Sequence, residues 1–401
     1  MAVFTAANPN LAVNMYQLFA FEPIYGANTI QLISPAPGAV VVSDFSVSAF
    51  AIFSIKYSNV NGSEIFDFDE TTPESGSFDK MEIFSGSELQ GALSGITPGL
   101  GNFGEIDLPL LAYKVLLGDD TITGSNLGDF LFTGDGGTDT VDAKGGNDVI
   151  DMAATAFAPF HSINGGTGTD TIQAFSNIFS ADTVLDLRNA TLQSIEALTI
   201  EGGITVRLLG SQIGAGVSSA AGITKSFGTG DATLEVVLNA AGAADLSGFT
   251  VGAGVSIKIF GSTGADTITG SNVSDAIRGE GGKDVLTGGA GGDTFEFLAL
   301  ADSAKKKALR DTITDFTKGD RIDLSGIDAS TKKGGDQAFK FTKKEGAALK
   351  KAGNLVYDQI DKKGTAKDMT IVYADTNGDK KADMAIALKG IVDLSKGDFL
   401  L

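Results

Sequence analysis

Four consecutive nonapeptides between residues 261 and 296 limit what this chain can fold into more than any other feature. They read GSTGADTIT, GSNVSDAIR, GEGGKDVLT and GGAGGDTFE, with aspartate at position six and an apolar residue at position eight of each. We expect glycines at positions one, two and four to turn the backbone through positive φ, and the next three residues to form a short strand that buries one apolar side chain. Two nonapeptides would then close one flattened coil. The pattern predicts an all-β fold built on a parallel β-roll or β-solenoid.

The position-six aspartates are expected to line both edges of this roll. Aspartates two units apart would lie one rung apart, at about 4.8 Å, and at an effective dielectric of about 20 two carboxylates at that distance repel by about 3.5 kcal/mol. A cation is therefore expected between them, and turns that offer only oxygen ligands suit Ca²⁺. The predicted ligands are Asp266, Asp275, Asp284 and Asp293, with the fourth-position glycines Gly264, Gly282 and Gly291.

An earlier block repeats the pattern less regularly. Its position-six residues, and that of a lone unit GGTGTDTIQ at 165–173, are further predicted calcium ligands: Asp120, Asp129, Asp139, Asp148 and Asp170. Residues 116–132 keep the aspartate and apolar positions but few glycines, and Val273 replaces a fourth-position glycine in the later block. We expect these turns to bind calcium weakly or only to cap the roll.

The units resemble the RTX family, in which the nonapeptide GGxGxDxUx forms a parallel β-roll with calcium between successive turns. The segments DTITDFTKGDRIDLSGIDA (311–329) and IVYADTNGDKKADMAIALKGIVDLSKGDFLL (371–401) are similar to the C-terminal region of the serralysin family of secreted metalloproteases. That resemblance implies an uncleaved C-terminal signal read by a type I secretion transporter, with Asp398 to Leu401 as its acidic-then-apolar ending. It also implies secretion to the exterior or the surface of a Gram-negative-type bacterium, which agrees with an N-terminus that lacks the features of a cleaved secretory signal.

Changes in repeat content and in the pattern of apolar, acidic and glycine residues along the chain predict five parts. They are a small, mostly antiparallel N-terminal β domain (1–113), a degenerate RTX block (114–173), a β-solenoid segment without calcium turns (174–260), the second RTX roll (261–300) and the C-terminal secretion domain (301–401). Within the first part, EIFDFDETTPE (64–74) is either an acidic surface loop or another ion site.

One segment of the C-terminal domain has the spacing of an EF-hand loop. Asp375, Asn377, Asp379 and Asp383 stand at i, i+2, i+4 and i+8, but isoleucine occupies position twelve in place of the bidentate glutamate. Either these residues bind an ion or they form an Asx-rich turn between two strands. The lysines 305–307 and others are expected to keep the domain solvated, with a phosphate or polysaccharide contact as the alternative.

Composition excludes several classes of protein. A formal net charge of −20 argues against a nucleic-acid partner, and the absence of cysteine excludes disulfides and thiolate metal sites. No apolar run is long enough for a membrane span. The charge is unevenly placed, since residues 301–401 carry 20 Lys and Arg against 16 Asp and Glu, whereas the first 300 carry 10 against 34.

Two classes of function remain. The only histidine, His161, cannot supply a serralysin zinc site, so protease activity is excluded, and we expect this histidine to be a loop residue without chemistry. The favoured class is a non-enzymatic, secreted calcium-binding protein of a surface layer, matrix or adhesin, with self-association or a cell-surface polysaccharide as partner. The alternative is a calcium-dependent lyase or epimerase acting on polysaccharide, for which the middle solenoid offers only Arg188 and Arg207.

Overall fold

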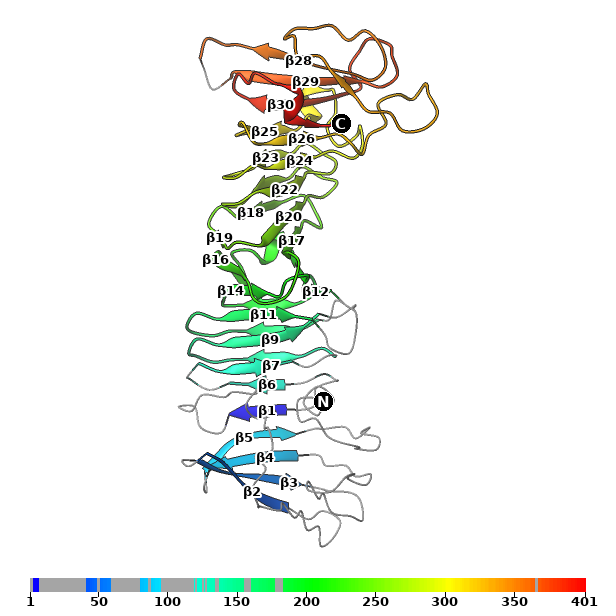
Figure 1. Ribbon diagram of the computed structural model, residues 1–401. Helices are drawn as coiled ribbons and strands as arrows, with labels where there is room; N and C mark the ends of the chain where they lie inside the picture. The colour runs from blue at the N-terminus through cyan, green and yellow to red at the C-terminus, as the bar shows by residue number, and fades with distance from the viewer. Residues whose placement is uncertain are drawn as a thin grey trace. The chain divides into compact units, whose positions relative to one another are not determined.

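We describe the protein from a computed structural model (Figure 1). It describes residues 119, 121–124, 126, 128–133, 137–154, 160–176, 183–364 and 367–401, and the backbone of five strands before them. Asp120 and the acidic segment 64–74 lie outside the described residues. The chain divides into two compact units, Met1–Ile204 and Thr205–Leu401, and each is described by itself.

The five N-terminal strands pair antiparallel, as the sequence predicts. They are β1 (Val3–Ala6), β2 (Val41–Ser48), β3 (Ala51–Ser58), β4 (Lys80–Ser85) and β5 (Glu88–Ser94), and they lie in the order β1-β5-β4-β3-β2. On its other side β1 pairs parallel with β6 (Thr121–Thr123), the first strand of the repeat block.

The rest of the first unit is a parallel coil that alternates between two sheets. One sheet holds β6, β8 (Thr140–Asp142), β10 (Ser162–Asn164) and β13 (Thr191–Gln193), and the other holds β7 (Phe130–Phe132), β9 (Val149–Ala153), β11 (Thr171–Phe175) and β14 (Ile195–Ile200). A short strand, β12 (Val184–Asp186), lies in the connection before β13. Each consecutive strand therefore adds half a rung to the coil (Figure 1).

The second unit continues the same construction. One of its sheets runs β15 (Thr205–Leu209), β17 (Ala232–Val237), β20 (Val255–Phe260), β22 (Asp275–Arg278), β24 (Thr294–Glu296), β26 (Arg321–Asp323) and β31 (Phe399–Leu400), all parallel. The facing sheet runs β18 (Ala243–Asp245), β21 (Thr267–Thr269), β23 (Val285–Thr287) and β25 (Thr312–Ile313). β16 (Val217–Lys225) pairs parallel with β19 (Thr250–Val251). The roll thus continues beyond residue 300 into β25, β26 and β31.

An antiparallel sheet closes the end of this unit. Its antiparallel strands are β28 (Asn354–Ile360), β29 (Met369–Asp375) and β30 (Met384–Lys389). At its two sides β30 pairs parallel with β25, and β28 pairs parallel with β27 (Lys340–Phe341). Three short 3-10 turns, η1 (Gly210–Gln212), η2 (Lys307–Leu309) and η3 (Lys396–Asp398), are the helical elements of the described residues. No helix in the described part of the chain is long and apolar enough to cross a membrane.

The core of both units is a stack of position-eight side chains. The three-residue strands β6, β21, β23 and β24 bury the central residue and leave the flanking residues half-buried or exposed. The buried set, at 1% exposure or less, comprises Ile122, Leu131, Val141, Ile150, Ile163 and Ile172 in the first unit and Ile268, Ile277, Leu286, Phe295, Ile313 and Ile322 in the second. The period-two pattern of the sequence therefore becomes a single apolar column in each unit, and the expected all-β roll is confirmed.

Phe295→Ala tests this column. Phe295 is fully buried and packs against Phe316, with ring centroids 6.3 Å apart. Because the narrow coil cannot collapse around the lost ring, we expect a loss of about 3–5 kcal/mol in the free energy of unfolding, measured by denaturant titration in saturating calcium. Val285→Ala, at a neighbouring position that is 37% exposed, should cost less than about 0.5 kcal/mol. Equal losses for the two variants would contradict the single-column core.

Candidate metal centre

The position-six aspartates lie at the two edges of the coil, directly before a strand or, for Asp275, at its first residue, and they are buried. In the second unit Asp266, Asp275, Asp284 and Asp293 are at most 3% exposed. The described members of the first unit, Asp129, Asp139, Asp148 and Asp170, are equally buried. Burying a carboxylate is costly unless its oxygens find partners.

At four of these carboxylates one oxygen accepts a backbone N–H from the preceding rung, whereas Asp275 accepts from Ser271 of its own unit. The N–H of Asp266 donates to Asp284 Oδ1 and that of Asp275 to Asp293 Oδ1, both at 2.9 Å. In the first unit Asp129 N–H donates to Asp148 Oδ1 at 2.7 Å, and Asp148 N–H donates to Asp170 Oδ1 at 2.9 Å. We call each such column a carboxylate ladder. The repulsion that the sequence predicted between carboxylates one rung apart is therefore partly reduced, because a backbone N–H donates to one oxygen of these carboxylates.

The second oxygen has no such partner at several rungs. Asp148 Oδ2, Asp170 Oδ2, Asp284 Oδ2 and Asp311 Oδ2 are buried and accept no hydrogen bond in the structure. A buried, unpaired carboxylate oxygen requires either a proton or a cation. Carboxylate oxygens are ligands that suit a hard cation such as Ca²⁺.

Position-one glycine has a different role from the one expected. A Cβ on Gly279 would lie 2.4 Å from Asp284 Oδ2, and one on Gly288 would lie 2.1 Å from Asp293 Oδ2. Neither glycine has a positive φ. Position one is therefore glycine because the carboxylate of its own unit packs against the backbone there, and not because the turn needs a left-handed residue.

Positions two and four do carry the positive φ, but only in the regular units. At position four φ is 129° at Gly282 and 123° at Gly291, and at position two Glu280 adopts 60° although it has a side chain. Gly264 and Val273, at position four of the first two units, have no positive φ. Only the last two units of the 261–296 block thus form the expected turn, so the prediction of that turn was wrong for Gly264.

Burial raises the pKa of these carboxyl groups. It brings the pKa of Asp148, Asp275 and Asp284 to about 7 and that of Asp293 to about 6. Burial also raises the pKa of Asp170. Neighbouring carboxylates add to the effect at each of these groups, because like charges disfavour ionisation.

The ladders extend into segments that the sequence analysis did not assign to them. Asp284 N–H donates to Asp311 Oδ1 at 2.8 Å, and Asp293 N–H donates to Asp320 Oδ1 at 2.9 Å. Asp311 is fully buried, and burial raises its pKa to about 8. The available signal was an apolar residue two positions after each aspartate, in DTI and DRI. It was missed because residues 297–310 interrupt the nine-residue period.

His161 lies in the loop directly before β10, as expected, and it is also a ladder member, which the sequence analysis did not foresee. Its Nδ1 accepts the N–H of Asp139 at 3.0 Å, the place that a carboxylate oxygen takes elsewhere, and lies 3.3 Å from Asp139 Oδ2. Burial lowers its pKa to about 4, so a neutral imidazole stands at this rung. Ile163, two residues on, is the buried apolar residue that marks the unit.

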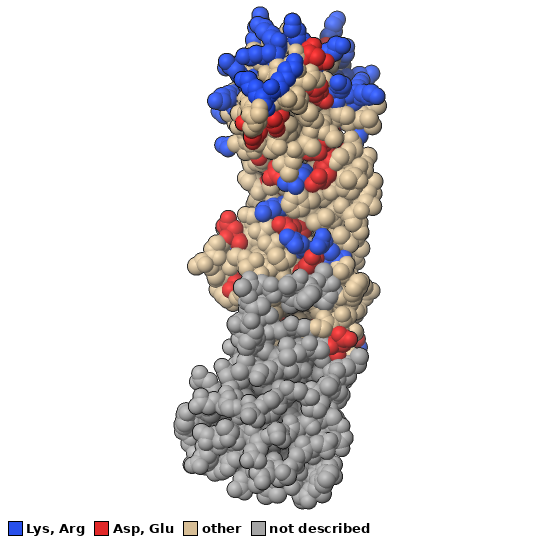
Figure 2. Space-filling view, turned by 90° about the vertical axis from the view of Figure 1, so that its right-hand side faces the viewer, with Lys and Arg blue, Asp and Glu red and all other residues tan. Residues whose placement is uncertain are grey.

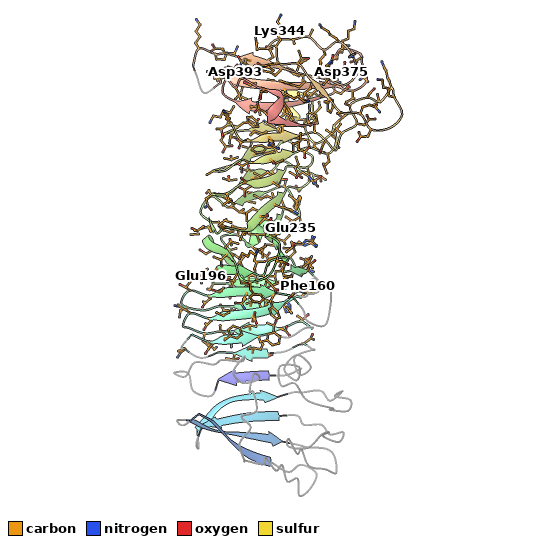
Figure 3. The ribbon with its side chains drawn as sticks, viewed as in Figure 1. Phe160, Glu196, Glu235, Lys344, Asp375 and Asp393 are labelled. Carbon is orange, nitrogen blue, oxygen red and sulfur yellow. The ribbon has the colours of Figure 1, made fainter. Side chains whose placement is uncertain are left out.

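The first unit's other ladder ends on a longer acid. Glu196 Oε2 accepts the N–H of Asp170 at 2.9 Å. Figure 3 labels Glu196 at one edge of the coil and Phe160, the neighbour of His161, at the other, so the two kinds of rung lie on opposite edges.

The EF-hand-like segment forms a hydrogen-bonded turn between β29 and β30. Asp375 accepts the N–H groups of Gly378 and Lys380, at 2.7 and 3.1 Å. Asp383 accepts from Thr376 and Asn377, including Asn377 Nδ2 at 2.7 Å. The carboxylates are thus directed at their own loop, as in an Asx turn. Nowhere in the described ranges do three acidic or histidine side chains converge as a ready metal cluster.

The raised pKa values predict a pH response whose sign depends on calcium. Without calcium, a carboxyl group whose pKa rises on folding contributes stability that is full below about pH 4 and lost as pH rises through about 7. Acidifying the chelated protein from pH 8 to pH 5 should therefore raise its melting temperature. In saturating calcium the same change should lower it, because protons compete with the ion. Melting curves at both pH values, with chelator and with calcium, check this, and parallel shifts in the two series would contradict it.

Comparisons with known proteins agree with this geometry for the C-terminal part. Residues 226–401 match the family described as "Peptidase M10 serralysin C terminal". Among solved structures, the AlgE6R3 subunit of the Azotobacter vinelandii mannuronan C5-epimerase is similar, with 21% identity over 43% of this chain and 80% of that chain. Its TM-score of 0.23 is too low to support an argument. No curated protein matches the sequence significantly. The match to the serralysin C-terminal family over residues 226–401 supports the RTX-type resemblance that the nonapeptides and the two C-terminal segments carry.

Proposed function

We propose that this chain is a secreted calcium-binding protein whose roll folds outside the cell when Ca²⁺ enters the carboxylate ladders. Export is by a type I transporter that reads the C-terminal region. The protein then works without catalysis, as a component of a surface layer, a matrix or an adhesive structure.

The observation that carries the proposal is the buried, unpaired oxygen of the ladder carboxylates. At Asp284 one oxygen accepts a backbone N–H while the other, Oδ2, has no partner. A cation at this oxygen would neutralise both the Asp284 carboxylate and the carboxylate of the neighbouring rung, so that neither would need a proton. Calcium suits the site better than a transition metal because the turns offer carboxylate and carbonyl oxygens and the chain has no cysteine. Gly282 and Gly291 shape turns whose carbonyls are the natural further donors.

Calcium would act on folding through mass action. An ion that binds only the folded state adds about 1.4 kcal/mol per site at ten times its Kd, and almost nothing far below it. Extracellular calcium modules have Kd values of about 10⁻⁴ to 10⁻³ M. Several such sites would leave the roll unfolded in a calcium-poor cytoplasm and folded outside.

The packing of residues 398–401 supports export before folding. β31 pairs with β26, Phe399 is 6% exposed and its ring lies 4.7 Å from that of Phe341. Asp398 Oδ2 accepts the N–H of Ser395. Because these residues are built into the folded unit, a transporter would read them in the unfolded chain, which is the state that low calcium favours.

The alternative, an enzyme acting on polysaccharide, has no specific observation in its favour. The two arginines on which it would depend are engaged with acids, since Arg188 lies 2.6 Å from Asp186 and Arg207 lies 2.6 Å from Glu235. Incubation with alginate or pectin, followed by assay for unsaturated products, separates the two classes. Product formation would favour the enzyme.

Removal of calcium from the full chain tests the proposal directly. We expect chelation to unfold at least residues 261–300, and the change is measured as loss of the β signal in circular dichroism and restored by adding Ca²⁺. Identical spectra with calcium and with chelator would overturn the proposal.

Asp284→Asn tests the ladder itself. The amide oxygen keeps the hydrogen bond from Asp266 N–H, but the charge that would hold the ion is lost. In chelator the variant should retain at least as much β signal as the parent protein, because a buried charge is removed. In calcium at about ten times Kd it should be less stable by about 1.4 kcal/mol. Asp245→Asn, at an exposed acid of β18, is the matched control and should show neither effect. Destabilisation of the Asp284 variant in chelator would argue for a purely structural aspartate.

A further inference from the structure

The surface of the C-terminal domain is far more basic than its sequence suggests. Residues 301–401 contain 18 lysines, and every one is exposed. Of the 16 acidic residues in the same range, only Asp336, Glu345, Asp361, Asp379 and Asp393 are exposed. Figure 2 shows the lysine side chains gathered over this part of the chain. The formal excess of four positive charges therefore understates what a partner in solution would meet.

The acidic side chains do not pair with the lysines, because their oxygens accept hydrogen bonds from backbone N–H groups. Asp302, Asp311, Asp320 and Asp375 are buried and accept backbone N–H groups. Half-buried acids such as Asp328 do the same, accepting from Ser330 and Gln337. Apart from Lys367, the lysines of this range form no ion pair in the part of the chain that the structure describes.

Six of these lysines lie together in three turns at one end of the β28–β29–β30 sheet. Backbone bonds join the turns, since Thr331 N–H donates to Thr376 O and Gly353 N–H donates to Asp375 O. Lys332 Nζ comes close enough to Gly378 that an added Cβ there would lie 3.1 Å away. We call the group Lys332, Lys333, Lys350, Lys351, Lys380 and Lys381 the lysine cluster. Figure 3 labels Asp375 at this end of the sheet and Asp393 at the other.

We propose that the lysine cluster is a docking surface for an acidic polysaccharide. This inference names the partner of the proposed surface or matrix role and rests on that role. Lysine is a compact, hydrated point charge on a flexible stem, so six of them on adjoining turns can follow single carboxylates spaced along a polymer without a fixed pairing geometry. The binding is electrostatic, and salt therefore weakens it.

The composition of the surface favours this partner over a protein or a nucleic acid. Protein interfaces are rich in arginine and aromatic residues and poor in lysine, whereas this range has 18 lysines and two arginines. Single-stranded nucleic acids are bound by a basic groove together with aromatic side chains on which the bases stack. Within 301–364 and 367–401 the exposed large hydrophobic residues are Leu309 and Ile391, neither of them aromatic. A second copy of this chain and duplex DNA are the competing occupants.

The test uses the full chain in calcium, with hyaluronan as the carboxylate polymer and a dextran of equal length as the neutral one. Titration calorimetry should detect binding to hyaluronan but not to dextran, with affinity falling as salt rises. Changing the six cluster lysines to glutamine should weaken binding by at least ~10-fold, because each exposed charge contributes modestly and six are lost. The matched control changes Lys305, Lys306, Lys307, Lys318, Lys389 and Lys396 to glutamine, which removes the same charge elsewhere. It should stay within about threefold of the parent protein if the cluster carries the site.

Each other outcome overturns the inference. Equal losses in the two variants would mean that net charge alone attracts the polymer. Tighter binding of duplex DNA than of hyaluronan would assign the surface to nucleic acid, and a solution mass that doubles in the parent protein but not in the cluster variant would assign it to a second copy. Circular dichroism on the same samples keeps the two proposals apart. A calcium-dependent fold without polysaccharide binding would sink only this inference, whereas a fold indifferent to calcium would sink the proposed function.

Discussion

The hydrogen bond from each repeat aspartate's N–H to the carboxylate of the next rung is the interaction on which the roll depends. The bond holds the accepting carboxylate against the neighbouring rung, where it is buried. The second oxygen of that carboxylate has no donor, as at Asp284 and Asp311. The rung spacing, the glycine at position one and the requirement for a cation or proton all follow from that arrangement. A longer or displaced side chain at position six changes the ladder locally, as His161 and Glu196 do in the first unit.

Ladders of this kind matter because the strands are very short. Most repeat strands have three residues and bury one side chain. A single rung therefore buries too little apolar surface to be stable alone, and stability comes from contacts between neighbouring rungs. A charge left unmet at one rung therefore weakens the rungs on both sides. The antiparallel sheet formed by β28, β29 and β30 also covers the edge of β25, which would otherwise present unpaired backbone groups.

The repeat period was enough to predict the strands, their parallel pairing and the buried column from Ile268 to Phe295. It was not enough to find Asp311 and Asp320, because their partners are 27 residues away rather than 18 and an insertion breaks the register. Nor could it assign His161 to position six, because that position is recognised in the sequence by an aspartate. The role of His161 follows from the hydrogen bond that it accepts from Asp139 N–H. The purpose of the position-one glycine was missed for a physical reason. The space that it leaves is occupied by a side chain five residues on, which depends on the folded turn and not on a propensity.

The same hydrogen bonds determine which charges reach the surface. Acids whose oxygens accept backbone N–H groups are drawn inward, in the ladders and in turns such as that of Asp375, while lysine, with a long stem and no acceptor, stays outside. The formal charge of −20 counts buried and exposed groups together. It argues against anionic partners only if acidic and basic side chains are exposed to the same extent. In the C-terminal domain they are not. The net charge, which argues against a nucleic-acid partner for the whole chain, therefore does not describe the surface of this domain.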